Sequence, residues 1–192
     1  MRRSEFGAMN ADDVATLAVE IAKAWNARDL DRVLGFLTDD VEWNDPAMQS
    51  PAKGKIAVQS FTQSLLRAFP DFVYIIRDPV CVAGDCSRCA VPWRISATHS
   101  DYFDPPGFAP TNRQAVFEGV DMLEFRGSQV CRIETLFDVI PPAEQLLGIS
   151  LRPPAGGFRE KCVVAIQRLF ALVARTALRS SSRKGSGETP AG

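Results

Sequence analysis

Apolar positions recur at helical spacing in three stretches of the first 70 residues and then alternate, as in strands, up to about residue 139. The predicted helices cover residues 10–25, Leu30–Leu37 and Lys55–Phe69, and Pro70 ends the third. Helices followed by a run of strands predict an α+β domain, in which a curved antiparallel β-sheet carries three N-terminal helices on one face. We expect a cone-shaped ligand cavity between sheet and helices.

The strand region is divided by tight turns and one Pro/Gly-rich loop. The predicted strands are 41–43, 72–82, 86–97, 114–125 and 129–139. Pro92 predicts an edge or a bulge in the third of them, because proline lacks the N–H that a central strand needs. Alternation along that strand places six side chains on one face: Cys89, Val91, Trp93, Ile95, Ala97 and His99.

The rest of the chain predicts one domain with extensions at both ends. Its parts are a leader or expression remnant (1–8), the domain (9–148), a linker (149–157), a basic amphipathic helix (158–179) and a disordered tail (180–192). Four prolines and three glycines make the whole of Pro141–Gly157 resemble a wrapping linker.

Composition and charge exclude several classes of protein. With 46% apolar and 23% charged residues and a net charge of −1, the chain is neither wholly disordered nor electrostatically suited to nucleic acid. Seven Lys or Arg and two Glu follow Phe158, a net +5 that leaves −6 on the remainder. The basic helix could therefore contact an acidic membrane surface or a partner, or be a solvated stripe on a packed helix. We see no secretory signal and expect a cytoplasmic protein.

Five cysteines raise the question of a metal. Cys81, Cys86 and Cys89 lie close together, but a structural zinc site needs a fourth ligand and His99 is the sole histidine. Small residues on a β-hairpin are the simpler interpretation. Since no phosphate loop, dinucleotide fingerprint or nucleophile motif is found either, we expect neither a metal nor a cofactor.

Two aspartates are candidates for acid–base chemistry. Asp45 follows Trp43-Asn44 and precedes Pro46, where an apolar setting would raise its pKa; it could instead cap a turn. Asp121 shares a predominantly apolar strand face with Phe117, where a carboxylate is costly unless it is paired, protonated or functional. An arginine or His99 could satisfy it structurally.

His99 and the tryptophans are weaker candidates. His99 could shuttle protons near neutral pH, although a lone histidine is often a hydrogen-bonded core or rim residue. We expect Trp43 and Trp93 to form the wall of a pocket or part of the core. The complete set of predicted site residues is Asp45, Asp121 and His99 for catalysis, and Trp43, Asn44, Trp93, Phe117, Leu123 and Thr135 for substrate binding.

Two groups of motifs resemble one superfamily over residues 9–148. Ala24–Asp31, Asp39–Pro46 and Val120–Phe125 resemble segments of ketosteroid isomerase, which has the nuclear transport factor 2 fold. A second group is similar to the SnoaL-like polyketide cyclases: Thr98-His99, Phe103, Pro110–Arg113, Phe117–Asp121, Phe137-Asp138 and Gln145–Gly148.

The resemblance implies an isomerase or cyclase that needs no cofactor and acts on a hydrophobic carbonyl compound such as a polyketide or steroid. It implies that Asp45 is the general base and that Asp121 stays protonated and donates to the enolate oxygen. This division of roles is that of ketosteroid isomerase itself. A homodimer formed through the sheet is a further implication of the resemblance.

Three family positions carry different residues here. Ile21 replaces the tyrosine that donates to the enolate, Thr135 replaces the acid–base aspartate of the cyclases, and Gly119 replaces the arginine of limonene epoxide hydrolase. The similarity to limonene epoxide hydrolase is weaker than the other two. It places Asn44 near the position of a water-binding asparagine. These differences leave two alternatives: a binding member without catalysis, or an epoxide hydrolase-like activity.

Overall fold

The computed structural model describes residues 9–150, 156–158, 161–162, 164–166 and 168. The chain divides into two compact units, Met1–Ile149 and Ser150–Gly192. In the second unit, the described residues from Phe158 to Arg168 are helical, which agrees with the start of the predicted basic helix. The predicted leader, most of the linker, the rest of that helix and the tail lie outside the described residues.

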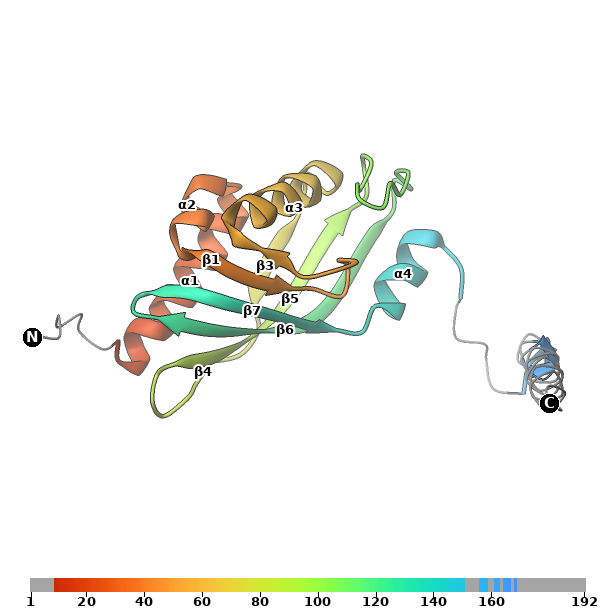
Figure 1. Cartoon of the computed structure of the whole chain (residues 1–192). Helices are drawn as coiled ribbons and strands as arrows, with labels where there is room; N and C mark the ends of the chain where they lie inside the picture. The colour runs from red at the N-terminus through yellow and green to blue at the C-terminus, as the bar shows by residue number, and fades with distance from the viewer. Residues whose placement is uncertain (1–8, 151–155, 159–160, 163, 167, 169–192) are drawn as a thin grey trace, which may run out of the picture. The chain divides into compact units, whose positions relative to one another are not determined.

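Three helices form where the apolar period predicts them, and their ends follow from local chemistry. Helix α1 (Ala11–Ala27) begins with a capping box between Asn10 and Asp13 and ends at Arg28, whose φ is 56°. Asp29 caps α2 (Leu30–Gly35), and α3 (Gly54–Ala68) follows a short strand. Figure 1 shows all three on one face of the sheet.

Seven strands form one curved sheet in the order β2-β1-β7-β6-β5-β3, with β4 also paired to β5. They are β1 (Leu37–Asn44), β2 (Ala52–Lys53), β3 (Val73–Ile76), β4 (Cys81–Val82), β5 (Arg88–Thr98), β6 (Gln114–Arg126) and β7 (Gln129–Phe137). The sheet is antiparallel, as predicted, at every strand pair except one, because β1 and β7 are parallel. Parallel strands need a long crossover connection, and here most of the domain lies between them.

Pro92 occupies a central strand rather than an edge. It pairs with Val120 of β6 on one side, and on the other it lies where the neighbour of β5 changes from β3 to β4. Its carbonyl faces that side and accepts from the N–H of Arg77. The missing N–H of Pro92 therefore faces a gap in the ladder, which explains how the sheet accommodates a proline.

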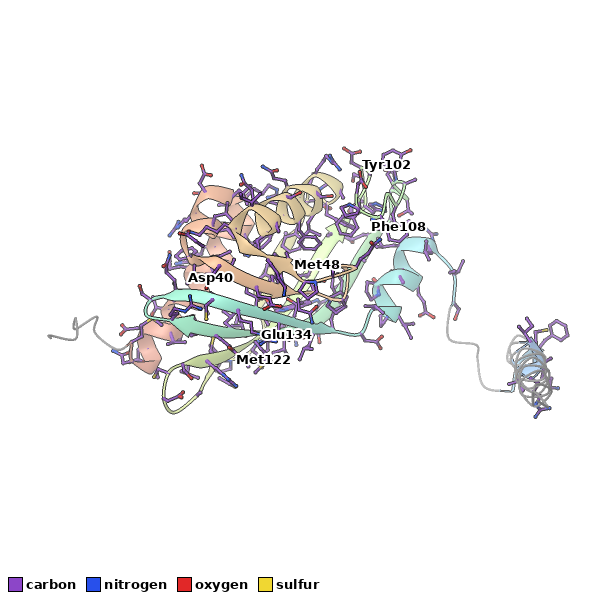
Figure 2. All side chains as sticks on the ribbon, in the orientation of Figure 1. Asp40, Met48, Tyr102, Phe108, Met122 and Glu134 are labelled. Carbon is purple, nitrogen blue, oxygen red and sulfur yellow. The ribbon has the colours of Figure 1, made fainter. Side chains whose placement is uncertain are left out.

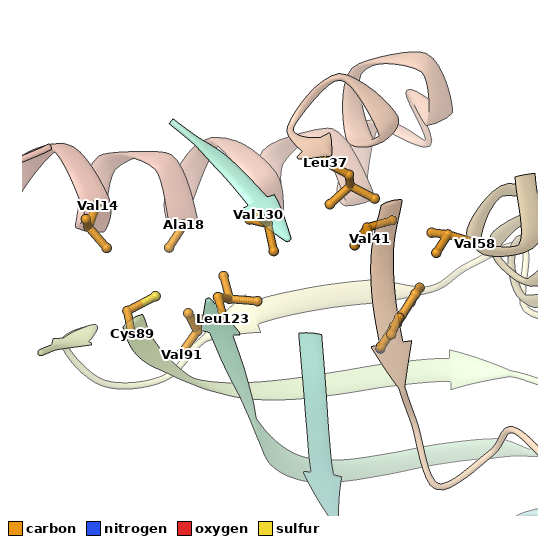
Figure 3. Close-up of a cluster of buried hydrophobic side chains, with 10 residues drawn as sticks. Val14, Ala18, Leu37, Val41, Val58, Cys89, Val91, Leu123 and Val130 are labelled. Atoms are coloured by element: carbon orange, nitrogen blue, oxygen red, sulfur yellow. The ribbon is translucent and has the colours of Figure 1, made fainter. Parts of the chain in front are cut away.

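The core lies between the helices and the inward face of the sheet. One cluster joins Val14 and Ala18 of α1 to Cys89, Val91 and Leu123 of the sheet, as Figure 3 shows. A second cluster surrounds Phe72, Trp93, Ile95 and Ala97. Both clusters contain side chains from the face of β5 that the alternation of apolar residues predicts.

Residues that the composition predicts to be linker form a fourth helix, α4 (Ile140–Leu147). The prolines do not prevent this helix, because they lie in its first turn, where backbone N–H groups have no helical partner. The Gln145 side chain accepts a hydrogen bond from the N–H of Val116 and donates one to its carbonyl, at 2.8 and 2.9 Å. Since the pairing of β7 with β6 ends at Gly119, this amide extends the hydrogen bonding along β6.

Candidate active site

A largely apolar cavity of about 340 Å³ lies among α1, α3, α4 and the inward face of the sheet. Its aromatic lining includes Phe103 and Phe108 from the loop between β5 and β6. Figure 2 shows Phe108 and Tyr102 on that loop, beside α3. The carboxyl and hydroxyl groups among the lining residues are few, and they belong to Asp45, Tyr74, Asp121 and Thr135.

Asp121 is the centre of a hydrogen-bond network in this cavity. The Tyr74 hydroxyl donates to its Oδ2 at 3.0 Å, and the Thr135 hydroxyl donates to its Oδ1 at 2.9 Å. The indole N–H of Trp43 donates to Thr135 Oγ1 at 3.0 Å. An indole N–H can only donate, so it orients the threonine proton toward Asp121.

Burial and hydrogen bonding have opposite effects on Asp121. Burial disfavours the charged form and raises the pKa of this carboxyl above its ordinary value. The donors Thr135, Trp93 and Tyr74 favour the charged form and limit that increase. Burial and the adjacent Asp121 carboxylate raise the pKa of Tyr74 well above its usual value, so its hydroxyl remains protonated.

Asp45 lies directly after β1, where the chain turns away from the sheet. Its Oδ1 accepts the Ala47 N–H at 2.7 Å, so the turn that the sequence suggests is present. Burial raises the pKa of Asp45 to about 6, and the negative charge of Asp121 adds to this increase. Asp45 therefore both caps the turn and lines the cavity.

Seven of the nine predicted site residues line the cavity: Asp45, Asp121, Trp43, Trp93, Phe117, Leu123 and Thr135. Asn44 does not belong to the lining, because its side chain donates to Glu134 Oε1 at 2.7 Å on the other face of the strands. Figure 2 shows Glu134 and Met122 on the face of the sheet away from α3.

His99 is also outside the cavity lining. It is 4% exposed, and its ring stacks on Phe69 with centroids 5.1 Å apart. Burial lowers its pKa, so the ring favours the neutral form. This environment is that of a core histidine, and the geometry does not support the catalytic role considered for it.

Tyr74 is the site residue that the sequence interpretation missed. The run from Phe72 to Val82 indicates strand, but its alternation alone does not say which side chains face inward. Tyr74 is assigned to the inward face by the pairing of β3 with β5, in which it lies opposite Ile95. The signal that could have identified Tyr74 is its hydroxyl group, because the hydroxyl of a buried tyrosine usually finds a hydrogen-bond partner, here a carboxylate on a neighbouring strand.

Metal binding has no visible basis in the described part of the chain. No group of three His, Cys, Asp or Glu side chains there could hold an ion. Cys81, Cys86 and Cys89 lie on and around the β4–β5 hairpin, as the simpler interpretation predicts. Among the same residues, no helix is both long and apolar enough to cross a membrane.

Sequence comparison identifies the family. The profile of the SnoaL-like domain matches residues 18–133, which is more than half of the chain. The chain belongs to the SnoaL-like family. This SnoaL-like chain matches none of the curated protein sequences.

Solved structures share the fold of this SnoaL-like chain. A proposed SnoaL-like polyketide cyclase from Jannaschia sp. CCS1 has a TM-score of 0.62 and 18% identity, covering 80% of this chain and 99% of its own. AclR from Streptomyces galilaeus, a proposed hydroxylase, has a TM-score of 0.61 and 20% identity, covering 73% and 99%. IdmH from Streptomyces antibioticus, a proposed polyketide cyclase, has a TM-score of 0.57 and 20% identity, covering 71% and 99%. At these identities the likeness is one of fold, the nuclear transport factor 2 fold that the motifs imply.

Proposed function

We propose that this protein is a cofactor-independent isomerase or cyclase that moves protons on a hydrophobic carbonyl compound. One observation carries the proposal: the two carboxyl groups among the cavity-lining residues, Asp45 and Asp121, both have a pKa raised mainly by burial. Titratable pairs in an apolar cavity are the usual arrangement for acid–base catalysis.

Asp45 is suited to act on a carbon-bound proton. With a pKa of about 6 it is largely ionised at neutral pH, yet it is a stronger base than an ordinary aspartate. A single backbone N–H from Ala47 holds one carboxylate oxygen. The other oxygen has no hydrogen bond within the described residues and is free to accept a proton α to a carbonyl.

Asp121 is suited to interact with the carbonyl oxygen. Tyr74 and Thr135 each donate to one of its oxygens and fix the orientation of the carboxyl group. Its raised pKa lets it bind a proton that it can share with the enolate formed when Asp45 takes the α proton. Ring closure or a double-bond shift would then follow from the enolate.

The substrate class follows from the cavity. Its volume of about 340 Å³ and its aromatic lining suit a compact polycyclic or polyketide-like ketone. The descriptions of the Jannaschia protein and IdmH as proposed polyketide cyclases agree with that class.

Hydrogen–deuterium exchange at the α carbon of candidate ketones tests this function directly. Ligands first selected by thermal shift from steroids, polycyclic ketones and epoxides would be incubated in D₂O with the wild type and with Asp45→Asn. We expect exchange to fall at least about a hundredfold in Asp45→Asn, as for the loss of a general base. Asp78→Asn, an exposed change outside the cavity, is the matched control and should exchange like the wild type. Equal exchange in all three proteins would contradict the proposal.

A non-catalytic binding function is the second candidate, and Ile21 favours it. This residue lines the cavity where the resemblance implies a tyrosine donor, so one expected source of enolate stabilisation is absent. Ligands that raise the melting temperature without any α-proton exchange would support this alternative. The epoxide hydrolase-like alternative has less support, because Gly119 offers no side chain to pair with the aspartates.

The sheet-mediated homodimer remains a proposal. Several apolar side chains are exposed on the face of the sheet away from the helices: Val73, Ile75, Met122 and Leu136, at 42, 51, 38 and 52%. Measuring the molar mass by light scattering, for the wild type and for Ile75→Glu, tests whether this face joins two copies. A monomeric wild type would reject the dimer.

A further inference from the structure

Tyr74 belongs to a short strand at the edge of the sheet. Strand β3 (Val73–Ile76) is the last strand in the sheet order of the described residues, and it pairs with β5 alone. The N–H and C=O groups along the outer side of an edge strand have no strand to bond. Because four residues paired on one side provide few backbone hydrogen bonds, the position of Tyr74 depends on what else holds this edge.

The side chain of Asn26, near the end of α1, closes this edge at Tyr74. Its Oδ1 accepts the Tyr74 N–H at 2.8 Å, and its Nδ2 donates to the Tyr74 carbonyl oxygen at 2.8 Å. An asparagine amide carries one acceptor and a pair of donor hydrogens side by side, so it can bond both backbone groups of one residue. At Tyr74 the amide thus takes the place of a neighbouring strand.

The residues on both sides of Asn26 also contact the approach to β3. The Trp25 ring packs against that of Phe72, with centroids 5.9 Å apart. Arg28, whose φ of 56° ends the helix, donates to the carbonyl oxygens of Pro70 and Phe72. The end of α1 is therefore fixed against the chain that leads into β3, and Asn26 has a defined position from which to hold Tyr74.

The residue that Asn26 holds is the one that donates to the buried aspartate. The Tyr74 hydroxyl lies 3.0 Å from Asp121 Oδ2, and a hydrogen bond weakens steeply beyond about 3.5 Å. A shift of β3 by about half an ångström therefore suffices to weaken this contact. Since the Tyr74 donor favours the charged form of Asp121, such a shift would also raise the pKa of that carboxyl group further.

We propose that Asn26 is a positioning residue for the site: its amide fixes the backbone of Tyr74 and thereby the hydrogen bond from Tyr74 to Asp121. Asn26 itself is exposed at the end of α1 and is not part of the cavity lining. Its importance for catalysis rests on the proposed function. Its influence on Asp121 does not, because that influence can be measured without a ligand.

Titration of Asp121 in the full-length protein provides the first test. Its carboxyl carbon signal, assigned with Asp121→Asn, would be followed by NMR against pH. Tyr74→Phe removes the donor and should raise the pKa of Asp121, and Asn26→Ala should raise it in the same direction by a smaller amount. Gln145→Ala is the matched control, because Gln145 likewise bonds both backbone groups of one strand residue, Val116. It should lower the stability and leave the titration unchanged. A wild-type titration in Asn26→Ala, or an equal shift in the control, would overturn the proposal.

A double-mutant cycle provides the second test, because it separates positioning from a general loosening of the fold. If Asn26 acts through Tyr74, adding Asn26→Ala to Tyr74→Phe should shift the pKa of Asp121 no further. The charge of Asp121 also acts on Asp45 and Cys89, but these residues lie after β1 and on β5, away from the edge that Asn26 holds. Additive shifts of the two changes would show that Asn26 acts by another route and would overturn the proposal.

Exchange of the α protons of 2-tetralone in D₂O separates this proposal from the proposed function. We expect Asn26→Ala to slow the exchange about three- to tenfold, because a misplaced group costs rate without being removed. A shifted Asp121 titration with no exchange that depends on Asp45 would support the positioning role and reject the function. Exchange that depends on Asp45, with titration and exchange both unchanged in Asn26→Ala, would do the reverse. If Asn26→Ala fails to fold, Asn26→Ser, whose side chain is one atom shorter, takes its place in every measurement.

Discussion

Asp45 links the site to the stability of the fold. Its pKa is about 6 in the folded protein against an ordinary 3.8, so between these values the folded state binds more protons than the unfolded state. The free energy of unfolding therefore decreases as pH rises from about 4 to 6 and stays reduced above that range. In physical terms, the protein retains a half-buried charge at neutral pH at some cost to its stability.

Asp45→Asn should consequently stabilise the protein above about pH 6. We expect a gain of about 1–3 kcal/mol in urea unfolding near pH 7.5, because a shift of two pKa units corresponds to about that much. The gain should disappear near pH 4, where Asp45 is protonated in the folded state. The Asn side chain can still accept the Ala47 N–H. A gain that is independent of pH would contradict the raised pKa.

Gly119 is a residue at which a single methyl group should matter. Gly119→Ala places a Cβ against Trp93 and the Leu136 carbonyl, so we expect a loss of about 1–3 kcal/mol in the free energy of unfolding and weaker ligand binding. Gly84→Ala is the control, since a Cβ there meets nothing within 4 Å and should change stability by less than about 0.5 kcal/mol. Equal effects of the two changes would mean that the Trp93 ring does not lie against Gly119.

Residue patterns predict part of the site. Asp121 stands out because a carboxylate on an apolar strand face needs an explanation, and Asp45 because an aromatic residue and a proline flank it. The donors to Asp121 could not be predicted in the same way, because Tyr74 and Thr135 come from β3 and β7 and only strand register brings them together.

At the scale of elements, α4 depends on Gln145 for its attachment to the sheet. Gln145→Ala removes both hydrogen bonds to Val116, and we expect a loss of about 1–2 kcal/mol in stability with faster amide exchange at Val116. Gln63→Ala, at an exposed glutamine of α3 for which the structure gives no hydrogen bond, is the control. Unchanged exchange at Val116 would show that α4 is held by its apolar contacts alone.

The sequence predicts whether a segment is a helix or a strand better than it predicts which strands pair with each other. The periods of the three helices and the long strands predict their positions within a few residues, because burial of one face determines the pattern. Besides the edge position predicted for Pro92, two predictions were wrong for identifiable reasons. Prolines in the first turn of α4 resemble those of a linker, and no local signal distinguishes the parallel β1–β7 pair from an antiparallel one.

At the scale of the whole molecule, the cavity and both described core clusters are formed by residues from Met9 to Leu146. A chain ending at Ser150 should therefore fold and bind ligands like the full chain, with a melting temperature within about 3 °C, because it loses no residue of these clusters. Thermal unfolding of both chains, alone and with a ketone selected by thermal shift, would check this. A large loss in either would show that residues beyond Ser150 support the domain.

The parallel pairing of β1 with β7 also determines when the site can form. Trp43 pairs with Ile133 and donates to Thr135, a residue 92 positions later in the chain. Contacts between such distant segments form slowly, because a long loop must close before they bring any gain. During synthesis, Trp43 leaves the ribosome long before β7, the strand that gives it a partner. The cavity that holds Asp45 and Asp121, the pair proposed to transfer protons, is therefore assembled late in folding, after nearly the whole sheet is available.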